Sequence, residues 1–173
     1  MTSLTANAGE NQTRIALFLF AAMAGAVGTA LLFQHVGGYM PCALCYMQRT
    51  PYYLGLPATM AAAYAHPLGA PSWVRRGLLL LAGLLMLYGG GLAIYHSGIE
   101  WAFWPGPASC TSSGAPIDTG GKGVLDAIDA VIPPSCDKAP WRFLGLSFAG
   151  WNVPISLGLA AIAFFGALTR KAD

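Results

Sequence analysis

Four cysteines offer the first chemistry in this sequence, and they come as two pairs with different spacing, Cys42 with Cys45 and Cys110 with Cys136. Cys42 and Cys45 form a C-x-x-C within Pro-Cys-Ala-Leu-Cys. Such a set could be a zinc site with four cysteine ligands, two structural disulfides, or two disulfides that exchange electrons. The spacing favours exchange, then structural disulfides, then zinc.

The C-x-x-C is the reason for this order. A disulfide between Cys42 and Cys45 would close so short a loop that it would constrain the unfolded chain little, so it suits redox chemistry better than stapling. Zinc sites built on a C-x-x-C usually have a second closely spaced pair, whereas Cys110 and Cys136 lie far apart in the sequence. We therefore expect no metal ligand in this chain.

Arg49 follows Cys45 by one helical turn. If a helix begins at Cys45, its N-terminal partial charge and the guanidinium would both favour a thiolate there. Arg49 could also hydrogen-bond a ligand oxygen, or it could simply extend to the membrane surface. We favour the functional role because an ionisable residue at membrane depth is costly. His35 and His96 could serve a ligand, but the residues alone favour interface anchoring for both.

Composition sets the class of protein. Of 173 residues, 55% are hydrophobic and 9% are charged, compared with about 25% charged in soluble domains. So few charges cannot cover the surface of a soluble fold. A disordered chain, a nucleic-acid-binding module and a small disulfide-stapled secreted domain are also excluded, and the net charge of +2 indicates no polyanionic partner.

Charge-free stretches locate the membrane crossings. Residues 15–33, 77–95 and 143–168 carry no charge, and each is about as long as the roughly 20 residues that cross a bilayer. A fourth crossing is needed to connect the first two, although Arg49 and Pro57 interrupt it. We predict a single all-α membrane domain, 1–173: a four-helix bundle with spans near 14–35, 46–65, 77–96 and 144–168, and outer loops near 36–45 and 97–143.

The basic residues predict the orientation of these spans. One side collects most of them: Arg14, Arg75, Arg76, Arg170 and Lys171. That side and both termini are predicted to be cytoplasmic, which places all four cysteines outside, where thiols tend to be oxidised. We expect the first stretch to be a span and not a cleaved signal peptide, because no base precedes Arg14. A short amphipathic helix is expected over residues 124–132.

The order and spacing of these motifs resemble the DsbB family of bacterial inner-membrane disulfide-forming oxidoreductases. The matching segments are Phe33-Gln34-His35-Val36, Pro41-Cys42-Ala43-Leu44-Cys45 with Arg49, Tyr95-His96, Cys110, Cys136, and Trp141-Arg142-Phe143-Leu144-Gly145-Leu146. The resemblance implies a multi-pass inner-membrane enzyme that reoxidises a periplasmic thioredoxin-like protein of the DsbA type. Its electrons would pass to a membrane quinone, ubiquinone or menaquinone.

The resemblance also implies a role for each cysteine. Cys110 and Cys136 would form the disulfide that the reduced partner attacks, with the mixed disulfide on Cys110 and the free thiol on Cys136. Cys136 would then attack Cys42, and Cys45 would be released as a thiolate that faces the quinone.

Arg49 would hold a quinone oxygen, and His96 would line the same pocket. The chain departs from the family at Gln48, where many relatives carry an acid, and in the Gly/Ser-rich loop between the last two cysteines. These departures leave open a DsbB-like paralogue with a dedicated partner, beside a membrane protein with inert disulfides. A vitamin-K-epoxide-reductase-like enzyme is disfavoured, because three spans follow the C-x-x-C in place of one.

Overall fold

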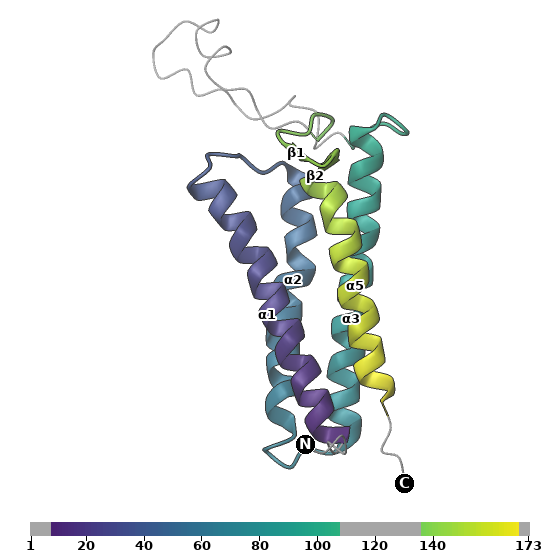
Figure 1. The fold of residues 1–173 in the computed structure, drawn as a ribbon. Coiled ribbons are helices and arrows are strands. Elements are labelled where there is room, and N and C mark those ends of the chain that lie inside the picture. The colour runs from purple at the N-terminus through teal and green to yellow at the C-terminus, as the bar shows by residue number, and fades with distance from the viewer. Residues whose placement is uncertain (1–7, 108–135, 170–173) are drawn as a thin grey trace, which may run out of the picture.

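Four long helices lie side by side in a computed structural model that describes residues 8–107 and 136–169 (Figure 1). The helices of the described parts are α1 (Ala8–His35), α2 (Ala43–Ala65), α3 (Ser72–Glu100) and α5 (Phe148–Leu168). Helix α3 packs against α2 and α5, and α1 packs mainly against α2. The predicted all-α membrane bundle is confirmed, while Cys110 and the helix expected over 124–132 lie outside the described residues.

Three of the helices are long and apolar enough to cross a membrane: α1 from Gly9, α3 and α5. Helix α2 does not meet the same criterion within the described parts of the chain, and its apolar run is broken near its start by Gln48, Arg49 and Thr50. Helices α1 and α3 extend beyond the predicted spans 14–35 and 77–96. The membrane limits of all four helices stay predictions.

Small residues let the helices approach closely. A Cβ atom added at Gly83 of α3 would lie 2.8 Å from the ring of Phe164 on α5, and one added at Gly55 would lie 2.8 Å from the sulfur of Met23. The centre of the bundle is filled by Leu19, Met23, Leu79 and Met86, which are fully buried. Lipid offers no hydrophobic drive between helices, so this close packing is what holds them together.

A two-stranded hairpin precedes the last helix. Strands β1 (Arg142–Phe143) and β2 (Leu146–Ser147) pair antiparallel, and Leu144 and Gly145 turn between them with φ of 52° and 84°. Two positive φ values are typical of the tightest hairpin turns and incompatible with a right-handed helix. Helix α5 therefore begins at Phe148, capped by the Ser147 hydroxyl that accepts from the Gly150 amide, and the expected helical start at residue 144 is corrected.

Candidate active site

The C-x-x-C lies at the first turn of α2, and the turn brings its two sulfurs together. Cys42 is the N-cap residue, and its sulfur accepts from the backbone amide of Cys45 at 3.3 Å. The two sulfur atoms are 2.9 Å apart, and both cysteines are free. A helix start at Cys45 was the condition considered above, whereas α2 begins at Ala43 with Cys42 as its N-cap. The partial positive charge of the helix N-terminus therefore lies at the Cys42 sulfur.

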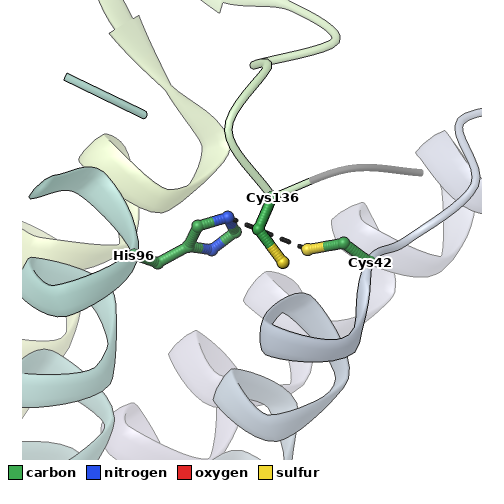
Figure 2. A group of neighbouring side chains, drawn as sticks. All are labelled: Cys42, His96 and Cys136. Carbon is green, nitrogen blue, oxygen red and sulfur yellow. Dashed lines mark hydrogen bonds between the residues drawn. The ribbon is translucent and has the colours of Figure 1, made fainter. Parts of the chain in front are cut away.

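Cys136 and His96 complete a buried cluster with Cys42. Figure 2 shows the three side chains pointing toward one another from the segment before β1, from α3 and from the start of α2. Their ligating atoms all lie within 4.8 Å of one another, and His96 Nε2 is 3.8 Å from the Cys42 sulfur. Cys136 is disulfide-bonded and almost fully buried. A thiol of the C-x-x-C thus adjoins the disulfide of Cys136.

This arrangement differs from a metal site in one respect. Distance alone would allow Cys42, His96 and Cys136 to share an ion. Zinc binds thiolates, however, and the Cys136 sulfur is already in a disulfide. Adjacent thiol and disulfide sulfurs are instead the reactants of thiol–disulfide exchange.

The surroundings of Cys42 favour its thiolate. A hydrogen bond from the Cys45 thiol lowers the pKa of Cys42 most, against the opposing effect of burial. The hydrogen bonds with His96 and with the backbone amide of Cys45 add to the lowering, and the pKa falls to about 4. The residues alone favoured a thiolate at Cys45. In the structure, where both thiols are reduced, it is the pKa of Cys42 that is lowered.

A cavity of about 470 Å³ opens beside the cluster. Its walls are mainly apolar, with Phe33, Trp141 and Phe148 among the aromatic ones. A volume of this size and largely apolar walls are typical of small-molecule sites. Trp141 stacks on Phe148 across 5.2 Å, so the wall that α5 and the hairpin contribute is built from packed rings.

Three of the predicted site residues meet in this cavity: Cys45, Arg49 and His96 all line it. The guanidinium of Arg49 donates to the Gln34 side-chain oxygen and lies 5.5 Å from the Tyr46 ring centre. Arg49 is therefore held at the cavity wall by neighbours on α1 and on its own helix. A thiol, a cation and apolar walls suit a flat apolar molecule that carries hydrogen-bond-accepting oxygens. His35, the other histidine considered, is not a lining residue of this cavity.

Sequence reasoning missed two polar residues behind His96. The Gln48 amide nitrogen lies 2.7 Å from His96 Nδ1, and the Gln48 oxygen accepts from the Asn152 amide at 2.8 Å. Both residues line the cavity, and Gln48 is buried. The signal that could have found them is a polar amide inside an apolar stretch, since such residues in membrane helices usually face a partner or a functional site.

Comparison with known proteins agrees with this geometry. The family described as "Disulfide bond formation protein DsbB" matches residues 12–166. A disulfide bond formation protein B of Aromatoleum aromaticum is 34% identical over 162 residues, covering 90% of this chain and 91% of its own length. The proteins of the same description from Azoarcus sp. and Polaromonas sp. strain JS666 are 31% and 38% identical, covering 88% and 79% of this chain and 90% and 77% of their own lengths.

The hydrogen bond between the two thiols can be tested by a matched pair of variants. Cys45→Ala removes the donor that lowers the pKa of Cys42 most, so that pKa should rise toward its ordinary value and alkylation of Cys42 near pH 6 should slow by about tenfold or more. Cys45→Ser keeps a hydroxyl donor and should retain part of the effect. Alkylation rates of the Cys42 peptide against pH, followed by mass spectrometry, measure both; identical profiles for the two variants would contradict this account.

Proposed function

The chain belongs to the DsbB family of disulfide-forming membrane oxidoreductases, and on this premise we propose that it reoxidises a DsbA-type thioredoxin-like protein and passes the electrons to a membrane quinone. The observation that carries the proposal is the meeting of Cys42 with Cys136 at one end of the bundle, next to a cavity lined by Cys45. The pair that contains Cys136 could thus exchange with the C-x-x-C pair, and Cys45 of the C-x-x-C would face a lipid-soluble acceptor in the cavity.

We assign this chemistry to the periplasmic side of the bacterial inner membrane. The cluster lies at the end of the bundle where α2 begins and α3 ends, and α1 begins at the opposite end (Figure 1). That opposite end carries Arg75 and Arg76 in the first turns of α3 and Arg14 early in α1. Basic residues favour the cytoplasmic face, which supports cytoplasmic termini and the four spans expected from the sequence.

The exchange steps balance in electrons and protons. A thiolate of the reduced partner attacks Cys110, which forms a mixed disulfide and releases Cys136 as a thiolate. Cys136 then attacks Cys42 of an oxidised Cys42–Cys45 pair, so that the Cys42–Cys136 bond forms and Cys45 leaves as a thiolate. The partner's second thiol displaces Cys110, and Cys110 displaces Cys42 from Cys136. Two electrons then reside on Cys42 and Cys45.

These steps would leave Cys136 disulfide-bonded and Cys42 and Cys45 as thiols, which is how the three sulfurs are arranged in the structure. While Cys42 is bonded to Cys136 it carries no charge, so the leaving thiolate is Cys45, and Arg49 lies one turn away from it. The guanidinium of Arg49 would favour that thiolate, because a nearby positive charge stabilises a thiolate. Cys45 is therefore positioned to hold the electrons at the cavity wall.

When bound here, a quinone would supply an acceptor for two electrons and two protons. The residues available to hold it are Arg49, whose guanidinium can donate to a carbonyl oxygen, and the aromatic wall around Phe33 and Phe148. His96 lines the same cavity and also faces the Cys42 sulfur, so it adjoins both reacting regions. The apolar walls exclude water from the thiolate.

Quinone reduction is the direct test of this function. Purified protein with a soluble quinone and a reduced thioredoxin-like protein should reduce the quinone, and Cys45→Ser should abolish the reaction. Arg49→Ala should raise the KM for quinone about tenfold, because the binding free energy of a hydrogen bond to a charged group corresponds to a change of that size. Arg76→Ala is the matched control, because Arg76 bonds the Ala167 carbonyl at the other end of α3. A chain with inert structural disulfides would show no quinone reduction in any form.

The order of cysteines has its own test. In Cys136→Ser, Cys110 has no disulfide partner and is a free thiol, so its thiolate should attack the disulfide of the oxidised thioredoxin-like partner, release one partner thiol and hold the other as a mixed disulfide, visible on a non-reducing gel. Cys110→Ser should give no such band. If no adduct forms with oxidised thioredoxin-like proteins of the periplasm, Cys110 is not the residue that bonds the partner.

A further inference from the structure

A chain of hydrogen bonds runs from α5 through α2 to the back of His96. The Asn152 side-chain oxygen accepts from the Tyr52 hydroxyl at 2.6 Å and from the Ser156 hydroxyl at 3.2 Å. The Asn152 amide nitrogen donates to the Gln48 oxygen at 2.8 Å, and the Gln48 nitrogen lies 2.7 Å from His96 Nδ1. Each amide therefore accepts on one side and donates on the other.

The two nitrogens of His96 face groups of opposite character. Nε2 faces the Cys42 sulfur at 3.8 Å and a carboxylate oxygen of Glu100 at 3.9 Å, and a thiolate and a carboxylate can only accept. Nδ1 faces the Gln48 amide nitrogen, which can only donate. The ring is buried with 3% exposure, so the bonds available there decide which nitrogen carries the proton.

From these contacts we propose that Gln48, oriented by Asn152, is a positioning residue that holds His96 as its neutral Nε2–H tautomer. The ring then donates to the Cys42 sulfur and does not act as a base toward it. Protonation of Nδ1 would require Gln48 to turn its oxygen toward the ring, and Asn152 to turn as well. Two amides on two helices thus set the state of one imidazole.

The consequence for the exchange reaction rests on the function proposed above. When Cys110 attacks Cys136, the new disulfide forms, the Cys42–Cys136 bond breaks, and its electron pair leaves on Cys42. A fixed Nε2–H stabilises that thiolate by a hydrogen bond, with no proton transferred. The hydrogen bond with His96 is among the causes that lower the pKa of Cys42, which agrees with a donor at this position.

This positioning of His96 requires an amide side chain at position 48. A carboxylate in its place would accept from Nδ1–H, so the ring proton would move to Nδ1 and Nε2 would become an acceptor facing Cys42. What His96 can do therefore depends on Gln48 being an amide, and the direction of the hydrogen bonds back to Tyr52 depends on it as well.

Asn152→Asp tests the proposal from a residue that acts on His96 through Gln48. An aspartate cannot donate to the Gln48 oxygen, so Gln48 should turn and present that oxygen to Nδ1, and the ring proton should move from Nε2 to Nδ1. Gln48→Glu should give the same change directly. The readout is the 15N NMR spectrum of histidine-labelled protein, with His96 assigned by the loss of its signals in His96→Gln.

Thiolate absorbance against pH gives the chemical consequence, in a Cys45→Ser background where Cys42 is the free thiol of the C-x-x-C. Both isosteric variants should raise the pKa of Cys42 and cut its thiolate fraction near pH 5 about tenfold or more. Thr59→Val is the matched control, because Thr59 is a buried polar residue of α2 that bonds its own helix backbone; it should leave both readouts unchanged.

These measurements test whether Gln48 positions His96 independently of the function proposed above. Neither measurement needs a quinone or a partner protein, so they stand even if the electron acceptor is different. If His96 keeps its Nε2–H signature in both Asn152→Asp and Gln48→Glu, Gln48 does not position the ring and the proposal is overturned. If Thr59→Val moves the same signals, the change reports general loosening of α2, which also overturns it.

Discussion

The contact between Cys42, Cys136 and His96 is the constraint on which the rest of the molecule depends. Two sulfurs can exchange electrons only when they come within bonding reach, and these two cysteines lie far apart in the chain and on different elements. The start of α2, the end of α3 and the segment before β1 must therefore meet at one point. The bundle below supplies a rigid base for that meeting, because its helices pack through small residues and filled gaps.

For the proposed function, the same end of the bundle must also admit a lipid-soluble molecule, and the cavity beside α1 offers the space for one. The cavity is lined by α1, α2 and α5 and by the aromatic residues around the hairpin. Helix α1 has far less contact with α3 than with α2, so it forms a side wall of the site while α2, α3 and α5 form the tight core. Cys45 then faces the cavity while Cys42, three residues earlier, faces the exchange cluster.

Polar groups buried among membrane helices are costly unless they are paired. Here Tyr52, Ser156, Asn152 and Gln48 pair with one another and end on His96. This network joins α2, α3 and α5, so it stabilises the bundle and orients the imidazole through the same bonds. The same hydrogen bonds serve both packing and chemistry because a membrane interior offers no water that could bond an unpaired polar group.

Hydropathy and charge were enough to predict the helical membrane class, the four helices and the placement of the C-x-x-C near the start of α2. These features are local: each helix must be apolar over its own length, whatever lies beside it. The resemblance of short motifs added the family. The helices α2 and α5 begin a few residues away from the predicted span starts, because a cysteine cap and a two-residue turn set where each helix begins.

Only the packed structure shows the contacts that lower the pKa of Cys42, and the residues that bond to His96. The residues alone favoured an anchoring role for His96, because nothing local indicates that it will face Cys42 on another helix. Asn152 and Gln48 are likewise separated by about a hundred residues of chain. Helix rotation and relative depth bring such groups together, and both are set by side-chain packing between helices, which no single segment of the chain contains.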